Sequence, residues 1–247
     1  MTRELVYGRN PVREALRGRR EVLEVWAGER AAAAAPWLAE GPRPRLCKER
    51  QLTEAAGTAD HQGLVAWCEP YPYADAWELA AGERPLLACL DQVTDPRNLG
   101  AVARSAAGAG ASGVVVPAHR AARVTAAVCR ASAGAVEHLP VAVVPNLARY
   151  LAEVKRGDLW AYAAAADAPT TLWEADLRGG LALVLGAEGR AVRPLVRRTC
   201  DAAVSIPLAA GVESLNVSVA AALLLYEARR QRAAGEAGRT SESNIRS

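Results

Sequence analysis

One stretch decides the fold of this chain: PLLACLDQVTDPRNLGAVARSAAGAGASGVVVP, residues 85–117. It opens with an apolar run, turns at the Asp-Pro pair 95–96 and closes with a second apolar run, residues 113–117. Between the two runs, Asn98 is a suitable cap for a helix that begins at Leu99. The stretch therefore predicts a strand, a helix and a second strand, the unit from which parallel sheets are built.

The predicted helix has an apolar face and a polar one. Arg104 points well away from the apolar stripe, so its guanidinium group can leave the core. This makes Arg104 a candidate for chemistry, and a solvated helix arginine is the simpler alternative. The apolar stripe consists of Leu99, Val102, Ala103 and Ala106.

Residues 108–113 read GAGASG, which fits the G-x-G-x-x-G pattern of dinucleotide-binding loops. In that fingerprint the glycine loop follows a strand and precedes a helix, whose N-terminal amides receive the pyrophosphate. Here the order is reversed, because the glycines follow the predicted helix and precede the strand. They stand where helix ends and tight turns use glycine, so the pattern does not indicate a nicotinamide or flavin site.

Apolar runs continue to alternate with helical patterns until a long apolar helix, residues 215–233, closes the domain. Strands that are apolar throughout and separated by helices indicate a mostly parallel sheet covered on both faces. The sequence thus predicts an α/β domain with a six-stranded sheet, whose strands fall within residues 85–93, 113–117, 139–145, 159–166, 181–186 and 202–208.

The rest of the chain divides by pattern and composition. Residues 1–70 read as a separate small α/β unit, and residues 71–84 interrupt the pattern as a linker would. Residues 85–232 form the main domain. The tail, residues 233–247, is small, polar and unpatterned, and we expect it to be disordered.

Charge is mild overall and uneven along the chain. The formal net charge of +3 does not by itself indicate a polyanionic partner. Residues 1–20 carry six arginines, and a second arginine cluster within residues 190–198 contains no acidic residue. Because the arginine fork suits phosphate oxygens, the clusters indicate either nucleic-acid contacts or two solvated basic faces.

Metal, disulfide and membrane sites are not indicated. The five cysteines include no C-x-x-C pair, and the three histidines have no carboxylate at metal-ligand spacing. No run approaches the ~18 apolar residues of a membrane span, and the N-terminus lacks the apolar segment of a secretory signal. We therefore expect no metal, no membrane association and a cytoplasmic location.

A second stretch with chemical potential begins at residue 181 with LALVLGAEGR. Gly186 and Gly189 bracket Glu188 just beyond a predicted strand, where the backbone can approach a ligand closely and where ligands collect in parallel sheets. A polar group follows, between an apolar strand and the apolar final helix. Helix capping explains one of its members but not all three, which are Glu213, Ser214 and Asn216.

Three ordered blocks carry a family resemblance: NLGAVARSA (98–106), LGAEG (185–189), and SIPL (205–208) with VESLNVSVAAALLLYE (212–227). They resemble the motifs of the SpoU, or TrmH, RNA 2′-O-ribose methyltransferases, over residues 85–230. GRNPVREAL (8–16) and HQGLVAW (61–67) resemble the small RNA-binding domain that precedes the catalytic domain in the branch acting on a guanosine of bacterial 23S rRNA. One departure is Ala191, where members often have the last glycine of G-x-E-G-x-G.

The resemblance implies a fold and a reaction. The implied fold is an L30e-like small domain followed by a SPOUT-like sheet with a C-terminal trefoil knot, which spacing alone could not reveal. The implied reaction moves a methyl group from S-adenosylmethionine to a ribose 2′-hydroxyl. The implied assembly is a homodimer whose arginine and cofactor belong to different subunits, and the apolar final helix is compatible with such an interface.

The resemblance also implies roles for individual residues. We expect catalytic roles for Arg104, Asn98, Glu188, Ser214 and Asn216, and cofactor contacts from Gly186, Ala187, Ile206, Leu208, Leu215 and Asn216. Arg9 and Arg13 are the expected RNA contacts. Because arginine stays protonated, the simplest role for Arg104 is to hold a phosphate and stabilise developing alkoxide charge rather than to accept a proton.

Other functions remain open at this point. The catalytic motifs fit a transfer RNA ribose methyltransferase equally well, and only the small domain favours ribosomal RNA. A resistance enzyme that methylates a ribosomal drug site is a further variant. A non-catalytic RNA-binding protein on the same fold is the alternative from another class.

Overall fold

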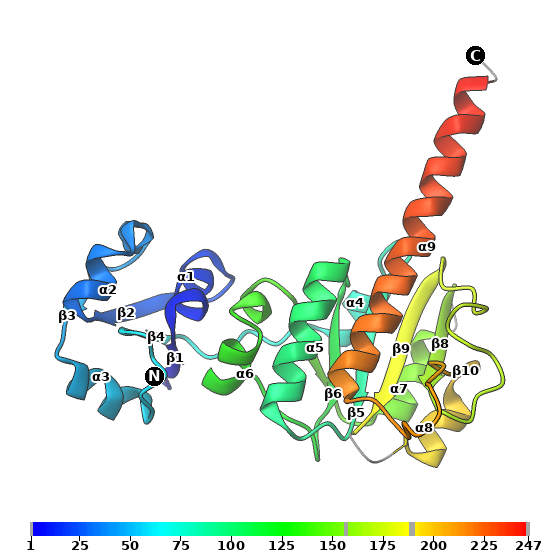
Figure 1. Ribbon diagram of the computed structural model, residues 1–247, viewed down its shortest axis with the longest axis horizontal. Helices are drawn as coiled ribbons and strands as arrows, with labels where there is room; N and C mark the ends of the chain where they lie inside the picture. The colour runs from blue at the N-terminus through cyan, green and yellow to red at the C-terminus, as the bar shows by residue number, and fades with distance from the viewer. Residues whose placement is uncertain (1, 156–157, 188–190, 246–247) are drawn as a thin grey trace. The chain divides into compact units, whose positions relative to one another are not determined.

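The computed structural model describes the backbone of residues 2–155, 158–187 and 191–245, and within these ranges the side chains as far as residue 235. The chain divides into two compact units (Figure 1). The small unit comprises residues 1–73, 95–104 and 122–140, and the large unit comprises residues 74–94, 105–121 and 141–247.

The large unit contains the predicted sheet. Its six strands are all parallel and lie in the order β10-β8-β9-β5-β6-β7. Each strand coincides with an apolar run that the sequence marks as a strand, so the predicted sheet is confirmed. The strands are β5 (Leu86–Asp91), β6 (Gly113–Pro117), β7 (Val141–Val144), β8 (Leu159–Ala164), β9 (Gly180–Gly186) and β10 (Ala202–Val204).

Helices bury both faces of this sheet. Every residue of β5 and β6 is buried, which explains why these strands are apolar without alternation. On one face, α7 (Leu147–Val154) and α8 (Pro194–Thr199) share a core with the strands. On the other, α9 (Val217–Ile245) contacts β9 and β5. Figure 1 shows α9 in front of the sheet and α7 and α8 behind it.

Helix α5 (Pro96–Ala109) begins earlier than the predicted start at Leu99. The Asp95 carboxylate accepts a hydrogen bond from the backbone N–H of Arg97 at 2.8 Å, and the Asp95 carbonyl accepts one from Leu99 at 3.2 Å. Asp95 therefore caps the helix. Asn98, the predicted cap, lies inside the first turn, because proline is well suited to the first helical position, just after a cap at residue 95.

The predicted faces of α5 are confirmed. Arg104 is exposed. The stripe on the opposite side is fully withdrawn from solvent, and it consists of Leu99, Val102, Ala103 and Ala106.

The GAGASG segment is the end of α5 and the turn into β6. Gly110 has a φ of +75°, the left-handed conformation that favours glycine at helix ends. The N–H of Ala111 donates to the carbonyl of Ala106 at 2.9 Å, which satisfies one of the last carbonyl groups of the helix. The glycines thus serve a helix-to-strand turn, as the sequence order predicts.

The small unit is built around a second sheet of four strands in the order β1-β4-β2-β3, with β4 antiparallel to β1 and β2. Its strands are β1 (Glu4–Tyr7), β2 (Val22–Ala27), β3 (Arg45–Leu46) and β4 (Leu64–Cys68). The helical elements between them are α1 (Arg9–Arg17), α2 (Glu29–Ala33), the 3₁₀ helix η1 (Pro36–Glu40) and α3 (Glu49–Ala56). These strands and helices agree with the small α/β unit that the sequence predicts for residues 1–70.

The small unit also includes α6 (Ala126–Ala131) and the 3₁₀ helix η2 (Ala135–Glu137), which the sequence does not assign to it. The buried guanidinium of Arg20 donates to both carboxylate oxygens of Glu137, at 2.9 and 2.7 Å. Burial lowers the pKa of Arg20, but the Glu137 bonds outweigh it and hold that pKa above its ordinary value. Sequence spacing does not reveal such a pair, because 117 positions separate the two residues.

Two further segments differ from their predictions. The linker contains a short helix, α4 (Ala76–Ala80), capped by the Asp75 carboxylate. Helix α9 continues to Ile245, where the sequence predicts a disordered tail from residue 233. No proline interrupts this tail, and its alanines and glutamates favour a helix, whereas its two glycines disfavour one. None of the helices in the described ranges combines the length and apolar character of a membrane span.

Candidate active site

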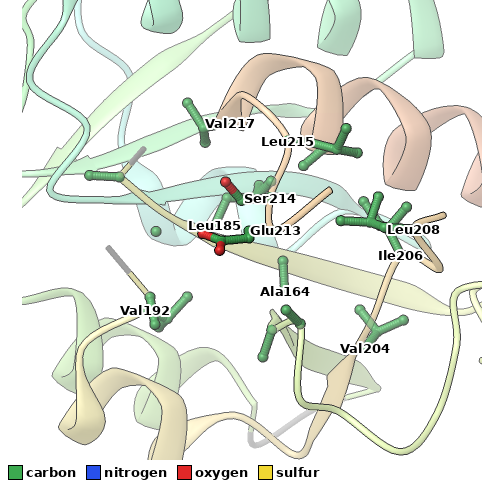
Figure 2. Close-up of a pocket in the computed structure, with 16 residues that line it drawn as sticks. Ala164, Leu185, Val192, Val204, Ile206, Leu208, Glu213, Ser214, Leu215 and Val217 are labelled. Atoms are coloured by element: carbon green, nitrogen blue, oxygen red, sulfur yellow. The ribbon is translucent and has the colours of Figure 1, made fainter. Parts of the chain in front are cut away.

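A cavity of about 380 Å³ opens in the large unit, at the carboxyl ends of β8, β9 and β10 (Figure 2). Ligands of parallel α/β sheets bind at this edge of the sheet. The volume lies within the ~300–1,000 Å³ typical of small-molecule sites. The cavity is therefore the candidate site for a small organic ligand.

Four parts of the chain that are distant in sequence meet around the cavity. They are the end of β8 with the residues after it, the end of β9 with the segment beyond it, β10 with its extension, and the approach to α9. The lining residues are Ala164, Ala165, Ala166, Leu185, Gly186, Ala187, Ala191, Val192, Val204, Ile206, Leu208, Glu213, Ser214, Leu215, Val217 and Ala220.

The chemistry of the lining is apolar with few polar groups. Glu213 and Ser214 are the polar side chains among the lining residues, and Figure 2 shows their oxygen atoms among the surrounding carbon side chains. Gly186 has no side chain, so a ligand can approach its backbone groups directly. Such a pocket suits a ligand with a large apolar surface and one or two polar or cationic groups.

The structure brings together most of the residues that the sequence assigns to a cofactor. Five of the six line the cavity, namely Gly186, Ala187, Ile206, Leu208 and Leu215. Asn216 is the exception, since it does not line the cavity.

Asn216 is the cap of α9. Its side-chain oxygen accepts hydrogen bonds from the backbone N–H of Ser218 at 2.8 Å and from the Ser218 hydroxyl at 2.6 Å. Its carbonyl accepts from Val219 and Ala220, both at 3.0 Å. The sequence leaves open which member of the polar group Glu213, Ser214 and Asn216 caps this helix. The structure assigns the cap to Asn216 and leaves Ser214 exposed at the cavity.

The remaining predicted catalytic residues lie on other segments. Asn98 and Arg104 both belong to α5 and to the part of that helix grouped with the small unit. Arg104 is exposed and Asn98 is half-buried. Glu188 lies outside the described residues.

One ion pair beside the cavity was not predicted from the sequence. Asp91 ends β5 next to Gly186 of β9, and its side chain is only 1% exposed. Arg193 donates to it from Nη2 at 2.7 Å. A charged residue at the end of an otherwise apolar strand is the signal that could have indicated Asp91. Its partner could not be inferred, because the two lie 102 positions apart.

The predicted RNA contacts, Arg9 and Arg13, both have partners within the small unit. The Arg9 guanidinium donates to the carbonyl of Ala34 at 2.5 Å and lies 5.9 Å from the ring centre of Trp37. Arg13 donates to Glu14 at 2.7 Å. Burial raises the pKa of Glu14, but hydrogen bonds from His138 and Arg13 outweigh it and hold that pKa below its ordinary value.

Several other arginines of the two basic clusters form ion pairs within the described residues, and the side chains of Arg3 and Arg17 remain 54% and 45% exposed. The pairs are Arg3 with Glu24, Arg17 with Glu40 and Arg20 with Glu137 in the first cluster, and Arg193 with Asp91 and Arg197 with Asp167 in the second.

Comparison with known proteins assigns both parts of the chain. The SpoU rRNA Methylase family matches residues 85–226, and the RNA 2′-O ribose methyltransferase substrate binding family matches residues 5–74. The first range includes all six strands of the large sheet and every residue that lines the cavity.

Individual relatives agree with these families. The chain is 38% identical over 247 residues to the 23S rRNA (guanosine-2′-O-)-methyltransferase RlmB of Vibrio vulnificus, covering 96% of this chain and all of the relative. It is 46% identical over 197 residues to RlmB of Ralstonia nicotianae, covering 78% and 79% of the two chains.

A solved structure supports the same assignment. The SpoU methyltransferase AviRb from Streptomyces viridochromogenes, in complex with AdoMet, matches with a TM-score of 0.79 and 29% identity, over 92% of this chain and 89% of that one. Sequence motifs, sheet order, cavity and relatives agree, and the chain belongs to the SpoU rRNA methylase family.

Proposed function

We propose that this protein methylates the ribose 2′-hydroxyl of a guanosine in 23S rRNA, with S-adenosylmethionine as the methyl donor. The observation that carries the proposal is the cavity at the ends of β8, β9 and β10, lined by five of the six residues that the motifs assign to the cofactor. Family membership supports the reaction class. The two RlmB relatives favour the guanosine of 23S rRNA over a transfer RNA.

The cavity residues fit S-adenosylmethionine. The alkyl groups of Leu185, Ile206 and Leu208 offer an apolar surface to an adenine ring, and Gly186 leaves backbone groups accessible. The Glu213 carboxylate offers a negative charge to the ammonium or sulfonium group. When bound, the cofactor supplies an electrophilic methyl group on a good leaving group.

The protein's own residues then have two tasks, to position the 2′-oxygen in line and to support the loss of its proton. Arg104 is our proposed catalytic residue, since its exposed guanidinium can bind the neighbouring phosphate and stabilise negative charge on the 2′-oxygen. Ser214 has its hydroxyl at the cavity and is proposed to orient the ribose. Asn98, Asn216 and Glu188 complete the proposed catalytic group, with Asn216 acting in addition to its capping role.

The small unit is proposed to bind the RNA. Support comes from the substrate-binding family that matches residues 5–74. A guanidinium group has five N–H donors, and the internal contacts of Arg9 and Arg13 use only some of them. Donors therefore remain for phosphate oxygens. A ribosomal RNA substrate also implies a cytoplasmic location.

The active form is proposed to be a homodimer in which Arg104 and the cavity come from different subunits. Support comes from an exposed apolar stripe on α9, formed by Val219, Leu223 and Tyr226, which are 46%, 38% and 50% exposed. These positions follow helical spacing, so they lie on one face of the helix. The C-terminal trefoil knot remains a prediction from the family resemblance.

Binding of S-adenosylhomocysteine tests the cofactor assignment directly. Titration calorimetry should detect binding to the full chain. Ala166→Trp, at an exposed position on the cavity wall, should weaken binding at least about tenfold by filling the site. Ala234→Trp, on the exposed side of α9, is the matched control and should bind like the unmodified chain. Equal binding by Ala166→Trp and the control would contradict the assignment.

A further inference from the structure

We propose that Gln231 of α9 is a positioning residue for the methyl donor. It holds residues 165–177, the wall segment, whose first two members Ala165 and Ala166 line the cavity. Every residue of the wall segment lies in the described part of the chain, and Gln231 itself does not line the cavity. This role rests on the proposed function, since it concerns the affinity of the same cavity.

The side-chain amide of Gln231 bonds to the backbone at the far end of the wall segment. Its Nε2 donates to the carbonyl of Ala175 at 3.0 Å, and its Oε1 accepts from the N–H of Leu177 at 2.9 Å. Nε2 also donates to the Glu227 carboxylate at 2.8 Å, one helical turn earlier on α9, which fixes the orientation of the amide. One side chain therefore satisfies a backbone donor and a backbone acceptor of the wall segment.

The rest of the wall segment is bonded to β10 and its extension. The N–H of Ala165 donates to the carbonyl of Val204 at 3.0 Å. Ser205 donates its N–H to the carbonyl of Thr170 at 2.9 Å, and its own carbonyl accepts from the N–H of Leu172 at 2.8 Å. Ala165, Val204 and the residue after Ser205 all line the cavity. A displacement of the wall segment therefore changes the shape of the cavity.

Burial makes the wall segment sensitive to the loss of Gln231. Ala175 and Leu177 are only 6% and 0% exposed, so without the amide their backbone carbonyl and N–H groups would be buried and unpaired. Unpaired buried polar groups are costly, and displacement of the segment into water relieves that cost. A ligand that needs the intact wall then loses affinity in proportion to the fraction of molecules that keep it.

Two variants of the full chain test this role. Gln231→Ala removes the amide and should weaken S-adenosylhomocysteine binding about tenfold, the loss expected when the intact arrangement falls to about a tenth of the population. Gln231→Glu keeps the size of the side chain but has no donor, and it places an oxygen against the Ala175 carbonyl and the Glu227 carboxylate. It should weaken binding by at least as much.

Arg230→Ala is the matched control. Arg230 pairs with the same Glu227 carboxylate at 2.7 Å, its side chain is 67% exposed, and among the described residues it makes no hydrogen bond to the wall segment. This variant removes a contact of α9 without touching the wall segment. It should leave S-adenosylhomocysteine affinity unchanged even where it lowers the unfolding temperature.

Hydrogen exchange and kinetics separate positioning from simple stability. In both Gln231 variants the amides of Leu172 and Ser205 should exchange faster than in the unmodified chain and in Arg230→Ala. The KM for S-adenosylmethionine should rise by about the same factor as the dissociation constant, while the KM for RNA stays unchanged. In the unmodified chain, S-adenosylhomocysteine should slow exchange of the Leu177 amide, because the coupling between cavity and anchor is reciprocal.

Unchanged affinity in the folded Gln231 variants would overturn the proposed role, and so would equal weakening by Arg230→Ala. Where neither Gln231 variant folds, the unmodified chain decides, since bound S-adenosylhomocysteine that left Leu177 exchange unaltered would contradict the coupling. If the unmodified chain failed to bind S-adenosylhomocysteine, the proposed function itself would fail, so the two failures are distinguishable.

Discussion

At the scale of single residues, Gly100 shows why the N-L-G-A block tolerates little change. A Cβ atom at this position would lie 2.5 Å from the Cβ of Ala131 and 2.8 Å from the carbonyl oxygen of Val128. Both neighbours belong to α6, and a backbone oxygen cannot rotate away from the added Cβ atom. Gly100 therefore permits close packing of α5 against α6 inside the small unit.

Gly100→Ala should destabilise the protein despite the better helix propensity of alanine. The propensity gain is ~1 kcal/mol, whereas the clash forces the backbones apart at a cost of ~1–3 kcal/mol or more. Urea unfolding followed by circular dichroism measures the balance, and we expect a lower midpoint. Gly82→Ala is the control, because nothing lies within 4 Å of its added Cβ. A midpoint for Gly100→Ala at or above the control would contradict the packing described here.

The spacing of residues along the sequence predicts which side chains are exposed to solvent better than it predicts their hydrogen-bond and ion-pair partners. Helical spacing correctly indicates that Arg104 is exposed, because it depends only on local geometry. The choice of cap at α5 was wrong, since Asp95 and Asn98 are both good caps and only the backbone decides between them. The pair of Asp91 with Arg193 could not be inferred, because it depends on which strands are neighbours in the sheet.

At the scale of elements, α9 has one face inside its own unit and another exposed. Its inner face packs against the sheet through Ala221, Leu224, Leu225 and Ala228, all at most 1% exposed. The outer stripe of Val219, Leu223 and Tyr226 is apolar as well. Burial within the unit therefore explains only part of the apolar character of this helix, and the outer stripe is the proposed dimer contact.

Leu223→Glu should convert the proposed dimer into a monomer. A carboxylate in the middle of an apolar contact must be desolvated without a partner, which opposes association. Sedimentation velocity at micromolar concentration measures the change. Leu46→Glu is the matched control, because Leu46 is 59% exposed and lies in the small unit. A monomeric unmodified chain, or a dimer that survives Leu223→Glu, would contradict the proposed interface.

Elements were predictable where burial shapes the sequence. The six strands of the large sheet stand out because strands buried on both faces are apolar throughout. The end of α9 was not predictable from the tail, because residues beyond 233 carry no apolar pattern and include glycines and serines, which disfavour helices.

At the scale of the whole molecule, the proposed active site takes Arg104 from one subunit and the cavity from its partner. Sequence order carries no information on whether they meet within one chain or across a dimer. The same holds for the small unit, which gathers residues 95–104 and 122–140 from within the methylase range. The sequence predicts each domain as one continuous range of residues. Which segments of one range pack with the other depends on the folded structure.

Mixing two inactive variants tests whether the site spans subunits. Arg104→Ala keeps the cavity, and Ala166→Trp keeps the arginine, so a mixed dimer has one complete site if the two come from different chains. After subunit exchange in an equal mixture, half of the dimers are mixed, and methyl transfer should recover to about a quarter of the unmodified level. No recovery in a mixture shown to exchange subunits would indicate a site contained within one chain.

The central claim is tested most directly by transfer of labelled methyl groups from S-adenosylmethionine to purified 23S rRNA and bulk tRNA in parallel. We expect label in 23S rRNA, on a ribose 2′-oxygen, and a loss of at least about 100-fold with Arg104→Ala, the magnitude typical when a charge-stabilising donor is removed. Label confined to tRNA would contradict the proposed substrate. Absence of label from both RNAs would contradict the enzymatic function and favour a protein that only binds RNA.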